Sequence, residues 1–143
     1  MKVIALALAG AMLGGAAAQA QDIANGEQIF NRRCKTCHMI VAPDGETIVK
    51  GGRTGPNQYG LIGAKAAHDP DFARYSDSLQ EAAEQGLVWT EAEVVKYLED
   101  PRAYLRAYLD DNSARSAMAF KLRDEADRAD VAAYLAQYSS ATN

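Results

Sequence analysis

The sequence predicts an all-α domain in which helices are joined by long loops. Apolar residues recur at spacings of three and four in several segments, whereas no stretch of useful length alternates apolar and polar residues as a half-buried strand does. Residues 39–75 and 110–120 carry glycine, proline, asparagine and aspartate and are expected to be loops. A chain of 143 residues is long enough for one such domain.

The N-terminus has the pattern of a secretory signal peptide. Lys2 precedes an apolar stretch, residues 3–18, and Ala18-Gln19-Ala20 has the small residues of a cleavage site. The alternative is an uncleaved membrane anchor, but the apolar stretch is short for a span of ~20 residues. We expect residues 1–20 to be a cleaved signal peptide and residues 21–143 to form the exported domain.

The first helix is expected to begin at Asp22, which can cap it, and to continue to about Cys37. Its apolar stripe would consist of Ile23, Gly26, Phe30 and Cys34. A glycine inside a helix costs about 1 kcal/mol relative to alanine. We therefore expect another helix to approach Gly26 more closely than a side chain would allow.

Two helices are predicted in the middle of the chain. Residues 76–85 form a short, weaker candidate that Gly86 ends. Thr90 and Glu93 have the spacing of a capping box, which begins a helix that continues to Asp100. The apolar residues of this second helix are Val94, Val95, Tyr97 and Leu98.

Two more helices are predicted towards the C-terminus. Pro101 suits the first position of a helix whose inward residues would be Tyr104, Leu105 and Tyr108. The last helix is expected from about Asp124 to Tyr138, because four of its first seven residues are acidic and suit the positive end of the helix dipole. Its apolar stripe would be Val131, Tyr134, Leu135 and Tyr138.

The strongest chemical motif is Cys34-Lys35-Thr36-Cys37-His38. In a helical turn, residues three and four apart share a face, so both thiols and the imidazole can meet one flat object. Two thiols can add to the two vinyl groups of a haem, and the adjacent histidine can then reach the iron as an axial ligand. The C-x-x-C-H spacing is typical of c-type haem attachment.

Besides a chance match of the spacing, two other interpretations of the cysteine motif remain open at this point. A thioredoxin-type disulfide would follow a strand in an α/β pattern, and no such unit is visible in the sequence. A closed zinc site needs four ligands, and His68 is the one obvious further candidate. Export, the trailing histidine and the lack of other cysteines favour haem attachment.

Composition argues against several classes of function. The 15 Lys and Arg residues against 19 Asp and Glu give a formal charge of −4 and a pI of about 5.1, whereas nucleic-acid binders normally carry a basic excess. Two histidines cannot make a three-histidine metal site, and two cysteines cannot make a disulfide-dense scaffold.

Taken together, these motifs resemble those of class I c-type cytochromes, specifically the bacterial cytochrome c2 group close to mitochondrial cytochrome c. The resemblance spans the exported domain and rests on the order and spacing of its blocks. It implies a class I cytochrome c fold, in which helices and long loops surround one covalently bound haem c. The blocks are residues 34–38, 50–60, 72–75, 86–89, 97–101, 116–122 and 131–135.

The resemblance also implies roles for individual residues. His38 would be the proximal iron ligand and Met118 the sixth ligand, and the carbonyl of Pro56 would accept a hydrogen bond from the other nitrogen of His38. Tyr97 would lie beside the methionine sulfur. Gly26, Phe30 and Tyr134 would form the crossing of the first and last helices. Hydrogen bonds around the haem propionates would come from Tyr59, Tyr75, Trp89 and Ser116.

The remaining methionines and histidines also bear on the sixth ligand. After cleavage only Met39 and Met118 remain, and Met39 adjoins His38, so it cannot reach the opposite haem face. Without a haem, Met118 would be taken as a core residue that fills a gap. The rival ligand is His68, which lies in a polar turn and by default would be a solvated surface histidine. Methionine ligation raises the haem potential, so Met118 predicts a high-potential protein.

Charge is unevenly distributed along the chain. Residues 67–111 carry 11 acidic and 4 basic side chains, whereas residues 21–66 carry 4 acidic and 6 basic ones. If the ligand segments surround an exposed haem edge, their basic residues would make a front that steers acidic partners. The alternative is an ordinary mixed, solvated surface. The basic residues near the ligands are Arg32, Arg33, Lys35, Arg115, Lys121 and Arg123.

The function that the resemblance implies is electron transport rather than catalysis. A monomeric periplasmic carrier would dock transiently at the membrane surface, between a cytochrome bc1 complex and a photosynthetic reaction centre or terminal oxidase, and would bind no nucleic acid. One alternative is a haem enzyme or gas-binding cytochrome with an open sixth position. A second is a thiol–disulfide oxidoreductase with titratable thiols or a reducible disulfide.

Overall fold

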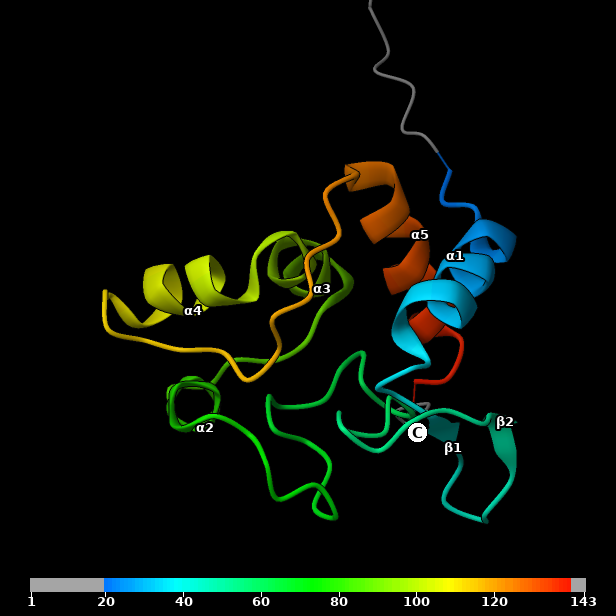
Figure 1. Cartoon of the computed structure of the whole chain (residues 1–143), viewed down its shortest axis with the longest axis horizontal. Helices are drawn as coiled ribbons and strands as arrows, with labels where there is room; N and C mark the ends of the chain where they lie inside the picture. The colour runs from blue at the N-terminus through cyan, green and yellow to red at the C-terminus, as the bar shows by residue number, and fades with distance from the viewer. Residues whose placement is uncertain (1–19, 140–143) are drawn as a thin grey trace, which may run out of the picture.

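The computed structural model describes residues 20–139, and the predicted signal peptide therefore lies almost wholly outside the described residues. Within that range the regular elements are helices apart from one small hairpin, and long loops join them, which confirms the all-α prediction (Figure 1). None of the described helices is both long enough and apolar enough to span a bilayer. The elements are α1 (Ile23–Ile29), η1 (Phe30–Cys34), β1 (Ile40–Val41), β2 (Thr47–Val49), α2 (Asp77–Glu84), α3 (Glu91–Glu99), α4 (Pro101–Leu109) and α5 (Glu125–Ala136).

Helices α1 and α5, which lie at opposite ends of the sequence, cross side by side (Figure 1). A Cβ atom on Gly26 would lie 2.1 Å from the carbonyl oxygen of Asp130, so only glycine permits this approach. The Phe30 and Tyr134 rings meet nearby, with centroids 5.7 Å apart. The Asn25 side-chain amide of α1 also donates a hydrogen bond to the Asp130 carboxylate of α5 over 2.8 Å, which links the two helices. The close approach expected at Gly26 is confirmed.

The first helix differs from the sequence prediction in two ways. Its α-helical part ends at Ile29, and a π-helical turn, η1, follows, in which the Lys35 N–H donates to the Phe30 carbonyl over 2.9 Å. The helix therefore stops at Cys34 rather than at Cys37. Ile23 is 43% exposed because it stands at the open end of the helix between the exposed residues Asp22 and Ala24. Its predicted inward position is wrong.

A short antiparallel hairpin, β1–β2, follows the cysteine motif and was not predicted. Ile40 pairs with Val49, and both side chains are buried. Gly45 in the connecting turn has a φ of +92°, which glycine adopts without strain. Strands of two and three residues are too short to show an alternating pattern in the sequence.

The remaining helices begin where the sequence predicts, each after a residue that caps it. Asp100 Oδ1 accepts from the backbone N–H groups of Arg102 and Ala103 at the start of α4, and Asp124 accepts from Asp127 at the start of α5. Ser76 caps α2 in the same way, and the Gln85 cap is followed by Gly86 with a φ of +96°. These boundaries agree with the sequence prediction.

The capping box of α3 is only half formed. Thr90 Oγ1 accepts from the Glu93 N–H over 3.1 Å, but the Glu93 carboxylate bonds Lys96 and Tyr104 instead of returning to Thr90. The Thr90 N–H donates to the Val88 carbonyl. A contact from the next helix has therefore replaced the reciprocal bond that the spacing predicts.

One predicted inward residue of α4 faces solvent. Leu105 is fully buried and Tyr104 is partly buried, whereas Tyr108 is 37% exposed. The Tyr108 ring stacks on Tyr104, with centroids 6.0 Å apart and an interplanar angle of 18°. Helix α4 lies at the edge of the molecule, so neighbouring helices cover only one side of it (Figure 1).

Candidate functional site

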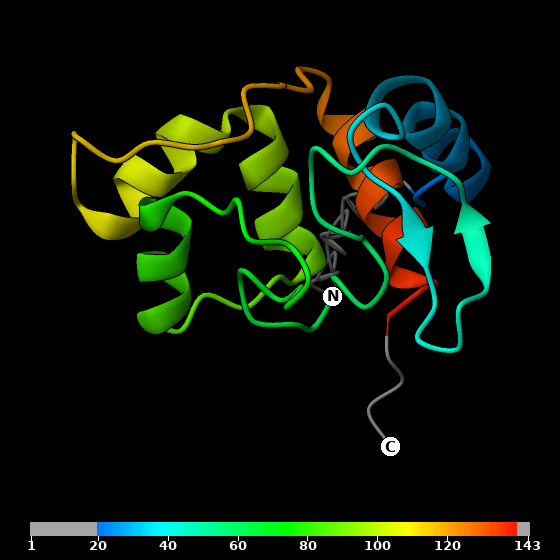
Figure 2. The same cartoon turned by 60° about the horizontal axis from the view of Figure 1, so that its bottom comes forward.

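A cavity of about 400 Å³ lies between the helices and the long loops. The segment between β2 and α2 crosses the molecule from the hairpin to α2, and contributes much of the loop wall (Figure 2). Most of the lining is apolar, but Cys34, Cys37, His38 and Met118 also line it. The apolar lining residues include Phe30, Leu79, Trp89, Leu98, Phe120 and Leu135.

The cysteine motif is built by one helical turn at the end of η1. The N–H groups of Cys37 and His38 both donate to the Cys34 carbonyl, over 3.0 and 2.9 Å. This turn places both thiols and the imidazole along one wall of the cavity, as the spacing predicts. Cys34 is buried and Cys37 is exposed, and the two thiols are not joined by a disulfide.

The thiol of Cys34 lacks the character of a redox-active nucleophile. Burial, with a smaller contribution from Cys37, raises its pKa to about 12, and the positive charge of Arg33 opposes the shift only in part. Reactive cysteines have a lowered pKa, because the thiolate is the attacking species. The environment of Cys34 therefore weighs against the thiol–disulfide oxidoreductase alternative.

A glycine-rich strap, residues 51–55, lies against the cysteine motif. The N–H groups of Gly52 and Gly55 donate to the carbonyls of Lys35 and Cys37 over 2.8 and 2.9 Å. A Cβ atom on Gly51 would lie 1.7 Å from the His38 carbonyl oxygen, and one on Gly55 would lie 2.3 Å from His38 Cε1. The motif and the strap approach so closely that neither position has room for a side chain.

The imidazole of His38 is held from one side. Its Nδ1 atom lies 2.8 Å from the carbonyl oxygen of Pro56, where the resemblance expects a hydrogen bond. A carbonyl can only accept, so Nδ1 carries the proton and Nε2 keeps a lone pair. Burial lowers the pKa of His38, although the Pro56 bond opposes the shift. A neutral imidazole with a free Nε2 is a metal ligand.

Met118 is partly buried and reaches the same cavity from the loop between α4 and α5. Ser116 holds this part of the loop: its Oγ accepts from the Met118 N–H and lies 3.1 Å from the Tyr97 hydroxyl. Burial raises the pKa of Tyr97, so the hydroxyl remains protonated. Tyr97 itself packs edge-on against Trp89, with ring centroids 4.9 Å apart.

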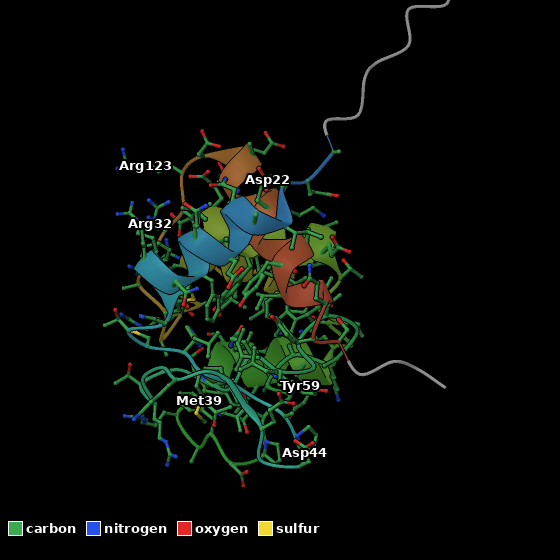
Figure 3. All side chains as sticks on the ribbon, turned by 90° about the vertical axis from the view of Figure 1, so that its right-hand side faces the viewer. Asp22, Arg32, Met39, Asp44, Tyr59 and Arg123 are labelled. Atoms are coloured by element: carbon green, nitrogen blue, oxygen red, sulfur yellow. The ribbon has the colours of Figure 1, made fainter. Side chains whose placement is uncertain are left out.

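The other predicted site residues lie in different places. Tyr75, Trp89 and Tyr97 line the cavity, whereas Tyr59 and Ser116 are not among its lining residues. The Tyr75 hydroxyl accepts from the Asp69 N–H over 3.1 Å, and burial raises its pKa to about 12. Figure 3 shows Tyr59 and Met39 below α1, and Met39 also lies outside the cavity lining.

His68 is not the solvated surface histidine that its polar turn suggests. It is partly buried and lines the cavity, and burial lowers its pKa. Its Nε2 atom lies 3.0 Å from the carbonyl oxygen of Asn57 and donates to it. That nitrogen is therefore not free to act as a ligand. Among residues 20–139, no three His, Cys, Asp or Glu side chains gather into a metal site.

Gln58 is a site residue that the sequence analysis missed. Its side chain is 8% exposed and lines the cavity, and its Nε2 lies 3.1 Å from the Pro56 carbonyl oxygen and 3.0 Å from His38 Nδ1. A glutamine in a polar loop carries no sequence signal of burial, because its type is mostly exposed in proteins.

The donor set of the cavity fits a haem c. Two thiols that can form thioethers, a neutral imidazole and a methionine thioether meet in one mostly apolar space, and its volume is within the usual range for a ligand pocket. The backbone of Gly55 packs against the imidazole ring, where a side chain would collide with it. None of these groups needs to move to another part of the fold to reach the cavity.

Comparisons with known proteins agree with this assignment. A profile of the family described as Cytochrome c matches residues 23–139. Cytochrome c-551 of Roseobacter denitrificans is 55% identical over 85% of this chain and 84% of its own. Cytochrome c2 of Rhodobacter capsulatus is 47% identical over 95% of this chain and 97% of its own. The X-ray structure of ferric cytochrome c-550 from Paracoccus versutus covers 85% of this chain at 46% identity, and all of that chain is matched, with a TM-score of 0.78.

Proposed function

The chain belongs to the cytochrome c family, and from this premise we propose that it is a periplasmic carrier of single electrons with histidine and methionine as axial ligands. One observation supports the ligand pair: Met118 and His38, 80 positions apart in the sequence, line the same cavity. Class I cytochromes c2 are its structural neighbours, and its haem c is attached through Cys34 and Cys37.

The haem, when bound, supplies the one-electron chemistry, and the chain determines how easily it changes oxidation state. His38 presents Nε2 while its Nδ1–H is held by the Pro56 carbonyl, which fixes the ring. Met118 presents a thioether, a ligand that raises the potential. The mostly apolar lining around both groups would keep water away from a haem bound there.

Two protein ligands, His38 and Met118, would distinguish a carrier from a haem enzyme that leaves one iron position open. Ser116 anchors the backbone of Met118, and the Tyr97 hydroxyl meets the same oxygen. With Met118 held at the cavity, a substrate or gas would have to displace it to bind. We therefore favour a non-enzymatic role over a haem enzyme or gas-binding cytochrome with an open sixth position.

Substitution of Met118 by alanine tests the ligand assignment. The haem should stay attached, the methionine-to-iron charge-transfer band should disappear, and the midpoint potential should fall. His68→Ala is the matched control, because His68 also lines the cavity, and both the band and a high potential should persist. An unchanged spectrum in Met118→Ala would reject the ligand. Rapid carbon monoxide binding by the ferrous wild-type protein would favour the open-site alternative.

The compartment and the partners extend the same proposal. Residues 1–20 act as a cleaved signal peptide, and residues 21–143 dock as a monomer at membrane redox complexes. The donor would be a cytochrome bc1 complex, and the acceptor a photosynthetic reaction centre or terminal oxidase. Support comes from the N-terminal pattern and from relatives named cytochrome c2.

Exposed basic side chains near the cavity segments support the docking step. Arg32, from η1, and Arg123, from the loop after Met118, project on the same side of the molecule (Figure 3). A basic front that includes these two residues would orient the molecule towards an acidic partner.

The salt dependence of electron transfer to an isolated bc1 complex or reaction centre tests this front. The bimolecular rate should fall steeply between low and moderate salt, since the Debye length shrinks to ~10 Å at 0.1 M. Neutral substitution of Arg32 and Arg123 should flatten the dependence, whereas substitution of the exposed Arg102 on α4 should not. A rate that salt leaves unchanged would contradict the docking proposal.

A further inference from the structure

Gln58 is a buried polar residue beside His38 to which the proposed function gives no role. Its backbone N–H donates to the Met39 carbonyl over 2.9 Å, which fixes the residue next to the cysteine motif. Its side chain is 8% exposed and points its amide nitrogen at the Pro56 carbonyl oxygen, 3.1 Å away. Burial of an amide is costly unless it is hydrogen-bonded, and this contact supplies the bond.

The Pro56 carbonyl oxygen therefore has two neighbouring donors. His38 Nδ1 lies 2.8 Å from it and Gln58 Nε2 lies 3.1 Å from it, while the two nitrogens are 3.0 Å apart. An amide nitrogen can only donate, and Nδ1 carries a proton whenever Nε2 is the ligand. His38 Nδ1 and Gln58 Nε2 therefore lie close together because both donate to the Pro56 carbonyl oxygen, and they are not hydrogen-bonded to each other.

Sharing the acceptor weakens the bond that His38 makes. A carbonyl that already accepts one N–H offers less electron density to a second, and the positive end of the amide dipole lies against the imidazole. Both effects reduce the electron density of the ring. A ligand with less electron density stabilises the metal less than an electron-richer ligand does. The oxidised, more positive state loses more of this stabilisation than the reduced state, so the midpoint potential rises.

We propose that Gln58 is a positioning residue that raises the midpoint potential of this protein by sharing the Pro56 carbonyl with His38. The inference rests on the proposed ligation by His38 and adds a residue that sets its strength. Gln58 acts through Pro56 and His38, without contributing a ligand itself.

Replacement of Gln58 by leucine and, separately, by methionine tests this role in the holoprotein. Both variants keep an apolar body of similar size and remove the donor. The equilibrium constant for reduction should fall about fivefold in each, as expected for a change in one hydrogen bond. In the ferrous protein, the proton resonance of His38 Nδ1–H should move downfield as its bond to Pro56 strengthens. Gln85→Leu, at an exposed glutamine, is the control and should change neither.

The results separate this inference from the proposed function. An unchanged or higher potential in both variants, with an unmoved Nδ1–H resonance, would overturn the role of Gln58 while the wild-type histidine–methionine spectrum stands. A potential that falls in only one variant would indicate a packing effect and would also overturn it. If the wild-type protein itself lacks the histidine–methionine bands, the proposed function is refuted instead. Should both variants fail to fold, a nuclear Overhauser contact between the Gln58 amide and His38 Nδ1–H in the wild type decides the matter, and its absence overturns the inference.

Discussion

The two segments that carry the proposed ligands are held in different ways. The cysteine–histidine segment, residues 34–58, is fixed largely by its own backbone: glycine N–H groups of the strap bond the motif carbonyls, and the Gln58 N–H bonds Met39. The methionine loop, residues 110–123, is held mostly by side chains, some from other elements and some from the loop itself. Ser78 Oγ accepts from the Arg115 N–H, and Ser116 Oγ accepts from the Met118 N–H.

The end of the methionine loop depends most on one buried side chain. Arg128 of α5 donates to the carbonyls of Leu122 and Arg123 over 3.0 and 2.7 Å, and its guanidinium lies 3.7 Å from the Glu99 carboxylate. Lys121 pairs with Asp100 at the surface. The Leu122 N–H also donates to the Leu98 carbonyl, so backbone contacts to the loop are present but few.

This contrast predicts different responses to change. A backbone-to-backbone contact at van der Waals distance cannot be adjusted by a rotamer change, so the cysteine–histidine segment should tolerate almost no added volume. Side-chain anchors can be removed one at a time. The methionine loop should therefore loosen in steps while the rest of the fold persists.

The largest effect is expected for Gly51→Ala. The new Cβ would lie 1.7 Å from the His38 carbonyl oxygen, so the strap must separate from the motif. We expect a loss of about 4 kcal/mol or more in the free energy of unfolding, measured by denaturation of the holoprotein, with a lower yield of attached haem.

Gly45→Ala is the control for Gly51→Ala. Gly45 has a φ of +92°, but an added Cβ there would have no atom within 4 Å, so alanine meets only backbone strain of about 1–2 kcal/mol. Equal losses at the two glycines would show that steric contact with the motif is not what fixes the segment.

An intermediate effect is expected for Arg128→Met. Methionine fills much of the volume but leaves the Leu122 and Arg123 carbonyls without their donor, at a cost of about 2 kcal/mol. During denaturation, the methionine-to-iron band should be lost at lower denaturant than the helical signal. Arg102→Met, at an exposed residue of α4, should change neither transition. Coincident loss of band and helix in Arg128→Met would contradict the separate anchoring of the loop.

The smallest effect is expected for Ser116→Ala. The substitution removes the acceptor of the Met118 N–H and the partner of the Tyr97 hydroxyl, worth about 1 kcal/mol in holding the loop closed. Imidazole added to the ferric protein should therefore displace Met118 with about fivefold higher affinity.

Ser113→Ala provides the comparison within the same loop. The Ser113 hydroxyl bonds Asp111 and makes no contact with Met118 or Tyr97, so the imidazole affinity should stay at the wild-type value. Equal affinities for the Ser113 and Ser116 variants would show that Ser116 does not hold the ligand in place.

Much of the fold follows from signals that act over a few residues. Asp22 caps its helix as predicted, and Ser76, Asp100 and Asp124 cap helices that start where the sequence predicts. A cap needs only its own side chain and the next turn of backbone. The thiols of the cysteine motif and His38 meet one cavity wall for the same reason, since their spacing is that of a single helical turn.

Errors arose where a contact beyond the local pattern decided the outcome. The Glu93 carboxylate does not complete the capping box because it bonds Tyr104 and Lys96 instead, and Tyr108 faces solvent because no element among residues 20–139 covers that side of α4. The hairpin was missed because its strands are held by pairing with each other and not by a pattern within either one.

The sequence by itself therefore determined the haem-attachment motif, the starts of the helices and the glycine at the helix crossing. Each of these depends on local spacing or on an unusual residue with one physical cause. Only the tertiary structure decided that Gln58 is buried against His38, that His68 donates to Asn57, and that Tyr59 lies outside the cavity lining. Burial and hydrogen-bond partners are properties of segments brought together from far along the chain, and no local pattern encodes them.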